Sequence, residues 1–276
     1  MTLGELLREG RAQLPRREAH WLLEHAAGLS AAGLRARTDQ SADASVTTGF
    51  RDLVRRRSSG VPLAHLVGTQ PFRQLELIVD ASVLIPRAET EELVTHVLEL
   101  IPAGLPCSAL DLGTGSGAIA LALAADRPHW SVAAVERSTA ALAVAGANGE
   151  RLGLQVEWLA GDWFEPVGHR RFDVIVSNPP YVNDNDPDLA PEVAAHEPPE
   201  ALLAGPDGLD AIRTITAGAS PHLTEGGWLI VEHGFRQAEA VRELMSNAGL
   251  ARITSFRDHA GRDRFTAAQH QETASG

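Results

Sequence analysis

The sequence predicts an α/β fold in which a mainly parallel sheet carries helices on both faces, preceded by a small helical module. Three observations support this prediction. From about residue 108 onward, short apolar strand patterns alternate with helical patterns, as expected for parallel strands joined by helical crossovers. In the first 60 residues, apolar positions follow helical spacing alone. The length of 276 residues suits two domains of roughly 100–200 residues each.

Residues 1–60 are expected to form the helical module. Its apolar positions are Leu3, Leu6, Leu7, Ala19, Trp21, Leu22, Leu23, Ala26 and Ala27. Gly28 is expected to end one helix, because glycine readily adopts the left-handed conformation found after many helices. A second pattern with Phe50 and Val54 runs into an arginine cluster and ends at 58–60.

Residues 61–82 are predicted to be a β-hairpin linker. Its two short strands are expected at His65–Gly68 and Leu75–Val79, around a polar turn. After the linker, Leu84-Ile85-Pro86-Arg87 leads into an acid-rich helix that begins near Ala88.

Residues 83–276 are predicted to form the main domain. Its strands are expected at 109–112, 132–136, 156–160, 172–177, 228–232 and 252–257, with helices at 117–125, 138–152, 209–219 and 236–247. A tail strand at 262–268 would join by a hairpin and would therefore be antiparallel.

The charge distribution argues against a large nucleic-acid interface. Lysine is absent, and residues 1–60 hold ten arginines against seven acids, whereas the rest holds fourteen against twenty-nine. Such an acidic body lacks the basic surface that a phosphate backbone requires. The cluster Arg51, Arg55, Arg56 and Arg57 could contact phosphates or an acidic partner, but such a run is more often a solvated helix face.

Composition excludes several other classes of protein. With 44% hydrophobic and 22% charged residues the chain is expected to be soluble, and the single cysteine, Cys107, excludes an internal disulfide framework. The histidines show no zinc-binding spacing, so no metal is expected. Charged residues near the start and a longest apolar run of only 118–125 predict a cytoplasmic protein without a membrane segment.

A glycine-rich loop, Gly113-Thr114-Gly115-Ser116-Gly117, follows the first strand of the main domain and opens a helix. Glycines there allow a tight turn and a close approach of the backbone to a ligand. About twenty residues later, Glu136 ends the second strand, where a carboxylate can bind both ribose hydroxyls of an adenosine. The loop predicts an adenosine-containing cofactor, and by itself it leaves NAD possible.

Two further features favour S-adenosylmethionine. Asp111 precedes the glycines, where its carboxylate could hold the methionine end of the ligand directly or through water. Asp162 and Trp163 follow the third strand; Asp162 could bind the adenine amino group, and Trp163 or Phe164 could offer a face to the ring.

The motif Asn178-Pro179-Pro180-Tyr181 ends the fourth strand and suggests methylation of a planar nitrogen. Successive prolines cannot continue a central strand, so they stiffen its exit. The Asn178 side-chain oxygen and the Pro179 carbonyl could each accept one N–H of a target –NH₂ group and direct its lone pair toward a methyl donor. Tyr181 could pack against the flat group of the substrate.

Some acidic residues and one histidine are not expected to be catalytic. Glu89 and Glu91 lie in a first helical turn, where the helix dipole favours acids. Glu232 could support the site or pair with a buried arginine, and His233 is expected to be structural, since this chemistry needs no strong base.

With these motifs the chain resembles the HemK-type peptide-chain release factor N5-glutamine methyltransferase family. The resemblance covers most of the sequence and includes Val83–Arg87 with Glu89-Thr90-Glu91, Asp111–Gly117, Gly161–Phe164, Ser177–Tyr181, Glu197-Pro198, Asp207–Asp210, Glu232-His233-Gly234 and Asp258–Arg264. Two positions depart mildly from the family pattern: Ala88, where proline is frequent, and Glu136, where aspartate is common.

The resemblance implies a Rossmann-like, seven-stranded class I methyltransferase domain with one antiparallel strand, behind a helical domain and a β-hairpin linker. It implies methyl transfer from S-adenosylmethionine, with S-adenosylhomocysteine as product, to the glutamine of the Gly-Gly-Gln loop of class 1 release factors. Gly113–Gly117, Glu136 and Trp163 match the family's cofactor positions, and Asn178–Tyr181 match its glutamine-binding turn, with Asn178 also next to the cofactor.

Other functions remain open at this point. They are glutamine methylation of a ribosomal protein, amino-methylation of a nucleic-acid base, a catalytically inactive docking module and NAD-dependent oxidoreduction. The acidic main domain disfavours nucleic acid, and an NAD enzyme leaves the Asn178–Tyr181 turn unexplained.

Overall fold

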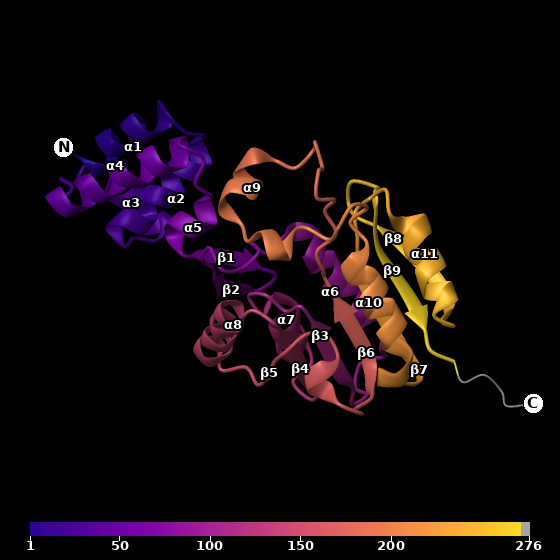
Figure 1. Cartoon of the computed structure of the whole chain (residues 1–276). Helices are drawn as coiled ribbons and strands as arrows, with labels where there is room; N and C mark the ends of the chain where they lie inside the picture. Colours follow the sequence, from indigo (N-terminus) through magenta and orange to yellow (C-terminus); the bar gives the residue numbers. More distant parts are fainter. Residues whose placement is uncertain (272–276) are drawn as a thin grey trace, which may run out of the picture. The chain divides into compact units, whose positions relative to one another are not determined.

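The computed structural model describes residues 1–271, and these form two compact units (Figure 1). One unit comprises residues 1–69 together with 190–196. The other comprises residues 70–189 and 197–271.

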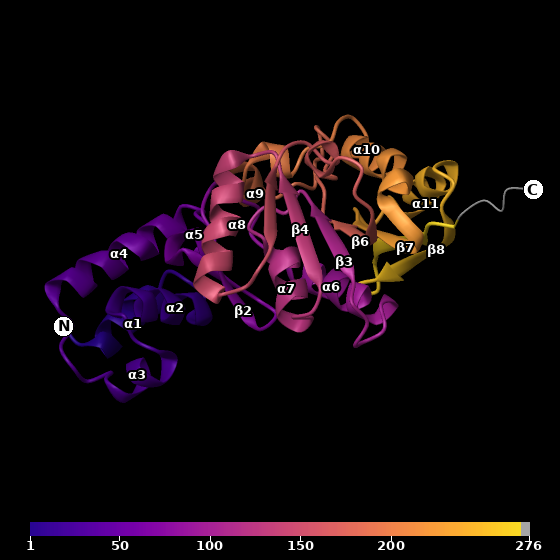
Figure 2. The same ribbon diagram turned by 90° about the horizontal axis from the view of Figure 1, so that it is seen from below.

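The first unit is helical. It contains α1 (Leu3–Arg11), α2 (Arg16–Ala27), α3 (Ala31–Ala36), α4 (Ala44–Ser58), α5 (Leu63–Val67) and α9 (Pro191–His196). Thr2 and Glu5 form a capping box at the start of α1, and Gly28, with φ 61°, ends α2 as the sequence predicts. Figure 2 shows α1 to α4 gathered together, and their apolar faces enclose Leu22 and Phe50, which are fully buried.

One predicted strand is wrong. His65–Gly68 belongs to no strand, because residues 63–67 form the short helix α5. Pro62 precedes this helix with φ −56°, and Gly68 ends it with φ 75°. The hairpin itself is confirmed, since β1 (Thr69–Phe72) pairs with β2 (Leu75–Ile78) in a separate two-stranded sheet. A short apolar run does not by itself distinguish a buried strand from a helical turn.

The described part of the second unit contains a seven-stranded sheet in the order β5-β4-β3-β6-β7-β9-β8. The strands are β3 (Ser108–Leu112), β4 (Ser131–Glu136), β5 (Glu157–Ala160), β6 (Phe172–Ser177), β7 (Leu223–Glu232), β8 (Ala251–Arg257) and β9 (Asp263–Gln269). Strands β3 to β7 pair in parallel, whereas β9 is antiparallel to both β7 and β8. The predicted fold class is confirmed, including the antiparallel tail strand.

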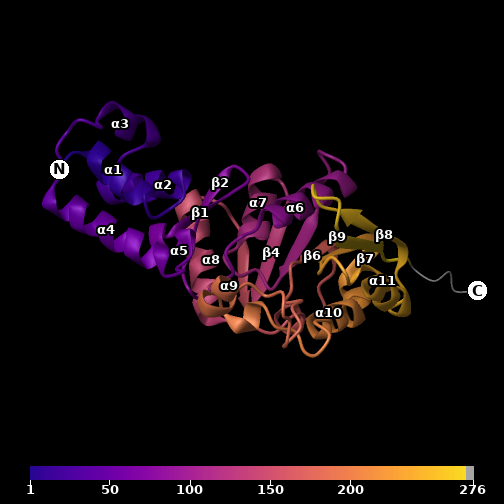
Figure 3. The ribbon, with the colours of Figure 1, turned by 90° about the horizontal axis from the view of Figure 1, so that it is seen from above.

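Helices cover both faces of this sheet (Figure 3). The helices are α6 (Ala88–Leu100), α7 (Ala118–Asp126), α8 (Thr139–Leu152), α10 (Asp210–Ala219) and α11 (Ala238–Asn247). Helices α6 and α7 share one apolar core with one face of the sheet, and α10 and α11 share a second core with the other face. Helix α7 has almost no polar face because seven of its residues, 118–124, are buried.

Strand β7 begins five residues before the predicted start at Trp228. Gly226 and Gly227 separate its first residues from its central part, and the register with β6 shifts between Phe172 and Val174. Gly226 adopts φ 76°, so the strand bends there and then continues. Among the described helices, none is long and apolar enough to cross a membrane.

The sheet order places the functional motifs at one edge. The order in which strands join the sheet reverses at β3. Strands β4 and β5 are added on one side of β3, and β6 is then added on its other side, parallel to β3. Ligands of open parallel sheets bind outside the carboxyl ends of the strands at such a switch point.

Candidate active site

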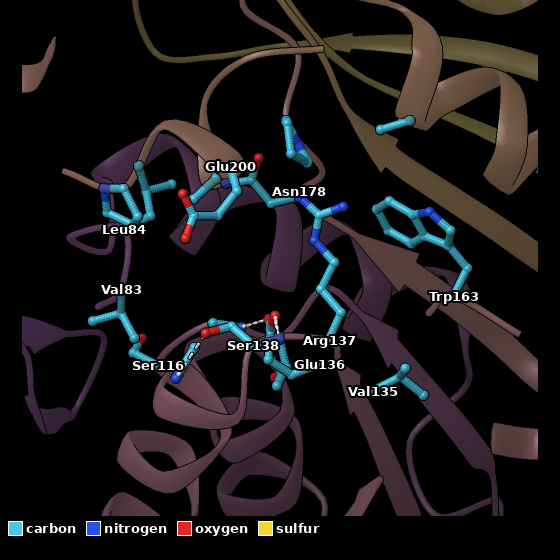
Figure 4. Close-up of a pocket in the computed structure, with 18 of the residues that line it drawn as sticks. Val83, Leu84, Ser116, Val135, Glu136, Arg137, Ser138, Trp163, Asn178 and Glu200 are labelled. Atoms are coloured by element: carbon cyan, nitrogen blue, oxygen red, sulfur yellow. Dashed lines mark hydrogen bonds between the residues drawn. The ribbon is translucent and has the colours of Figure 1, made fainter. Parts of the chain in front are cut away.

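A cavity of about 360 Å³ lies at the carboxyl ends of β3, β4, β5 and β6 (Figure 4). The predicted residues that line it are Gly113, Thr114, Gly115, Ser116, Glu136, Asp162, Trp163, Asn178 and Pro180. Motifs up to 67 residues apart in the sequence are therefore brought to one cavity, as the parallel sheet requires.

The glycine loop forms one side of the cavity. Gly113, Gly115 and Gly117 have φ values of 69°, 55° and 84°, which are left-handed conformations that favour glycine. Gly117 caps α7 behind the cavity wall, and a Cβ there would lie 3.0 Å from both Leu121 and Trp158. The loop is thus held close to the core, with the backbone of Gly113 and Gly115 lining the cavity.

Asp111 does not line the cavity. Its Oδ2 accepts hydrogen bonds from the Thr114 hydroxyl at 2.5 Å and from the Ala120 N–H at 3.2 Å, so it braces the glycine loop against α7. Complete burial raises its pKa to about 7. Its Oδ1 has no hydrogen-bond partner within residues 1–271, and contact of Asp111 with the methionine end of a ligand stays a prediction.

Glu136 is held at the cavity wall by the backbone. Its Oε2 accepts from the Gly115 N–H and its Oε1 from the Ser138 N–H, both at 2.9 Å, and Figure 4 shows Glu136 beside Ser138. Each oxygen keeps a further lone pair, so a fixed carboxylate is available for two adjacent hydroxyls. This geometry suits the ribose of an adenosine.

The loop after β5 contributes the aromatic part of the wall. Trp163 lines the cavity, has φ 45° and lies 3.5 Å from where a Cβ on Gly113 would be. Phe164 points elsewhere, because its ring stacks on His222 with centroids 4.7 Å apart. Of the two aromatic residues considered for adenine, only Trp163 lies in the cavity wall.

Asn178, the first residue of the Asn178–Tyr181 turn, lies across from Ser116 and Glu136 in the view of Figure 4. The Asn178 Nδ2 donates to the Thr90 hydroxyl at 3.0 Å, while its Oδ1 is buried without a hydrogen-bond partner among the described residues. Pro180 lines the cavity, but Pro179 and Tyr181 do not. Direct contact of the Pro179 carbonyl and the Tyr181 ring with a substrate therefore stays a prediction.

Two residues behind the turn have unusual environments. Glu232 accepts from the Thr90 hydroxyl at 2.8 Å and from the Tyr181 hydroxyl at 3.2 Å, and burial raises its pKa to about 7. Burial also raises the pKa of Tyr181 and lowers that of His233. The neutral His233 donates from Nδ1 to the Gly234 carbonyl and accepts from the Thr266 hydroxyl, so it is structural, as expected.

Several residues of the cavity wall were not predicted from the sequence. They include Val83, Leu84, Thr90, Arg137, Ser138, Glu200, Leu203, Asp210 and Thr214. Arg137 and Ser138 directly follow Glu136 and could have been found from their place after β4. Glu200 lies in the one-turn 3-10 helix Pro199–Ala201 and Leu203 follows it, in a segment too short to carry a periodic signal.

Glu197 explains how the segment before α6 reaches the cavity. Its Oε2 accepts from the Ile85 N–H at 3.1 Å, and its Oε1 pairs with the Arg87 guanidinium at 2.5 Å. The side chain of Glu197 is 2% exposed, so this ion pair is well shielded on the carboxylate side. Glu197 therefore ties the segment before α6 to the chain that follows α9.

The fold and the site define an S-adenosylmethionine-dependent methyltransferase of the Rossmann-like, seven-stranded class. The glycine cradle, the fixed Glu136 carboxylate and the Trp163 ring fit an adenosine. Asn178, which follows the neighbouring strand β6, lines the same cavity and has a buried oxygen without a partner among the described residues.

Within this class, the chain belongs to the release factor glutamine methyltransferase family. It is 44% identical over 262 residues to the release factor glutamine methyltransferase of Xylella fastidiosa, over 95% of each chain. Identity to that of Geobacter sulfurreducens is 43%, over 95% of this chain and 92% of the other. Residues 3–68 match the PrmC N-terminal domain family, and residues 90–197 match the Methyltransferase small domain family.

Solved structures support the fold. A methyltransferase from Pyrococcus furiosus is similar with a TM-score of 0.55 at 18% identity, over 80% of this chain and 98% of that chain. The ribosomal protein L11 methylase from Lactobacillus delbrueckii subsp. bulgaricus has a TM-score of 0.51 at 19% identity, over 67% and 79% of the two chains. At these identities the similarity shows a shared fold alone.

Proposed function

We propose that this protein transfers a methyl group from S-adenosylmethionine to the side-chain amide nitrogen, N5, of the glutamine in the Gly-Gly-Gln motif of class 1 release factors. The observation that carries this proposal is the Asn178 Oδ1, a buried acceptor without a partner in the described chain, on a residue that lines the cavity. A buried acceptor of this kind requires a donor, and a primary amide supplies one.

The proposed chemistry follows from the electronic structure of an amide. Its nitrogen lone pair is delocalised, so the nitrogen is a weak nucleophile until it is oriented and its N–H groups are bound. The Asn178 Oδ1 and the Pro179 carbonyl would each accept one of these N–H groups, which aims the lone pair and stabilises positive charge formed during transfer. S-Adenosylmethionine supplies an electrophilic sulfonium methyl. The new N–C bond forms as the S–C bond breaks, and one amide proton is released to water.

The proposed cofactor contacts divide by residue type. Backbone groups of Gly113, Thr114, Gly115, Ser116 and Gly117 would approach the methionine and ribose parts. Glu136 would bind the ribose hydroxyls, Asp162 the adenine amino group and Trp163 the adenine ring. Asp111 would hold the methionine end of the cofactor from beneath the loop, directly or through water. Asn178 would lie where substrate and cofactor meet.

We also propose a division of labour along the chain. Residues 1–60 would dock the protein substrate, residues 61–82 would link, and residues 83–276 would carry out methyl transfer. The proposed location is the cytoplasm, where release factors meet the ribosome.

Mass spectrometry of a class 1 release factor tests this function. After incubation with the protein and S-adenosylmethionine, the factor should gain about 14 Da, mapped to the Gly-Gly-Gln glutamine. A release factor with that glutamine replaced by glutamate is the matched control, and it should gain nothing. Methylation of a ribosomal protein instead, with the release factor unmodified, would overturn the proposed substrate.

A further inference from the structure

A chain of hydrogen bonds runs from the cavity wall into the core of the second unit. Asn178 Nδ2 donates to Thr90 Oγ1 at 3.0 Å, and Thr90 Oγ1 donates to Glu232 Oε2 at 2.8 Å. Thr90, on α6, and Glu232, at the end of β7, are 4% and 1% exposed. Thr90 lines the cavity, whereas Glu232 lies behind it.

The chemistry of the three groups fixes the direction of this chain. An ionised carboxylate can only accept, so Thr90 must direct its single hydroxyl hydrogen at Glu232. The Thr90 oxygen then offers only lone pairs to Asn178, and only the –NH₂ end of that amide can satisfy them. The Asn178 Oδ1 is thereby directed away from Thr90, and it is the end left without a partner in the described chain.

We infer that Thr90 and Glu232 are positioning residues that select the amide orientation of Asn178, so that its oxygen rather than its nitrogen meets the substrate amide. This inference rests on the proposed function, because the orientation matters only for a substrate that presents an N–H group. With the opposite orientation, the Asn178 –NH₂ would oppose the –NH₂ of the substrate.

The same carboxylate also holds the other end of the turn. The Tyr181 hydroxyl donates to Glu232 Oε1 at 3.2 Å, so the two oxygens of Glu232 bind the partners of Asn178 and Tyr181 separately. Between them, Pro179 and Pro180 restrict the backbone. One buried acid thus fixes both polar ends of the turn that would receive the substrate.

Protonation of Glu232 should disturb this arrangement, because a carboxylic acid can donate a hydrogen bond to Thr90 and release the Thr90 hydrogen toward Asn178. Burial raises the pKa of Glu232 to about 7, and Arg264 on β9 opposes this shift. The other described groups around it are Thr90 and Glu89 of α6, Tyr181 of the turn and the neutral His233; Asp258 lies 3.6 Å from Arg264. Methyl transfer should therefore fall as pH decreases through about 7.

The experiment compares Thr90→Val, Thr90→Ser and Glu232→Gln with the full-length wild type. Thr90→Val removes the hydroxyl, and we expect kcat for release-factor methylation to fall about 10–100-fold, with the Kd of S-adenosylmethionine changed less than about threefold. Thr90→Ser keeps the hydroxyl and should stay within about threefold of wild type. Thr216→Val, at a buried threonine of α10 whose hydroxyl binds only backbone carbonyls, is the control for burying valine.

The pH profile separates positioning from general damage. Glu232→Gln cannot titrate, and its amide can donate to Thr90, so we expect low activity at all pH values and loss of the inflection near pH 7. Asp111, whose pKa is also raised to about 7, would keep that inflection if it were the cause. Thermal melting and cofactor binding identify a misfolded variant. If Glu232→Gln misfolds, the comparison of kcat between Thr90→Val and Thr90→Ser tests the positioning role.

The outcomes for the inference and for the proposed function are distinct. If the wild type does not methylate a release factor, the proposed function fails. If the wild type is active but Thr90→Val matches Thr90→Ser in kcat, or a folded Glu232→Gln keeps the wild-type pH profile, the positioning role is overturned.

Discussion

At the scale of single residues, Asn178 and Glu136 both line one cavity, and their substitution should have separable effects. Asn178→Ala removes the acceptor for the substrate amide, so kcat should fall on the order of 100–1,000-fold while the Kd of S-adenosylmethionine changes only a few-fold. Glu136→Gln should instead weaken the binding of S-adenosylmethionine and change kcat little. One of its two backbone donors, Gly115 N–H or Ser138 N–H, would face an –NH₂ group.

Calorimetry for cofactor binding and single-turnover methylation of a release factor measure these two effects independently. A large loss of cofactor binding in Asn178→Ala would place that residue in cofactor recognition alone. Wild-type turnover in the same variant would remove it from the mechanism.

The residue scale also shows the limit of prediction from sequence for the site. Motif order along the chain is sufficient to place Glu136, Trp163 and Asn178 at one edge of a parallel sheet, because each lies at or just after the end of a strand. It does not show which side of the wall a side chain occupies. Asp111 and Tyr181 lie behind the wall, whereas Thr90 lines the cavity from α6, a helix whose contact with β7 depends on tertiary packing.

At the scale of elements, the entry into α7 depends on a glycine that has no room for a side chain. Gly117 has φ 84°, and a Cβ would lie 3.0 Å from Leu121 and Trp158 and 3.3 Å from Ala145. Gly117→Ala should destabilise the second unit by about 2–4 kcal/mol, combining backbone strain with overpacking.

Gly153 provides the matched control for this prediction. It ends α8 with φ 66°, and a Cβ there would meet no atom within 4 Å. Gly153→Ala should therefore cost only about 1–2 kcal/mol, from backbone strain alone. Urea unfolding of the two variants measures the difference, and equal losses would show that crowding at Gly117 contributes nothing.

The fold elements were predictable where the apolar pattern was long and unambiguous. Helices 118–126 and 139–152 and the strands between 108 and 177 begin within one residue of their predicted starts. Prediction failed at residues 63–67, where five residues between Pro62 and Gly68 form a helical turn. In so short a segment, the buried contacts of Leu66 and Val67 determine the conformation, and these contacts are not visible in the sequence.

At the scale of the whole molecule, most of the arginines in the cluster 51–57 pair with acids of the first unit. Arg51 pairs with Glu9 at 2.7 Å, Arg57 pairs with Glu18 at 2.6 Å, and Arg55 pairs with Asp52. Three of the four clustered arginines are thus engaged with acids of the same unit. This arrangement supports the prediction that the cluster is mainly a solvated helix face. Because these charges are already paired, the proposed docking of a partner would depend on shape and apolar contacts.

That docking role predicts a selective defect when the first unit is shortened. A variant that begins at Gln70 removes α1 to α5 together, which avoids leaving Leu66 and Val67 without their core, while both cores of the second unit remain intact. The Kd of S-adenosylmethionine should change less than about threefold. The kcat/KM for an intact release factor should fall at least about tenfold, because capture by a second contact is lost. For a short peptide containing Gly-Gly-Gln, which has no surface to dock, kcat/KM should remain near that of the full-length protein.

Parallel assays of the shortened variant on the two substrates test whether residues 1–69 dock the release factor. Equal losses of kcat/KM on both substrates would place the effect in the methyltransferase unit and exclude docking.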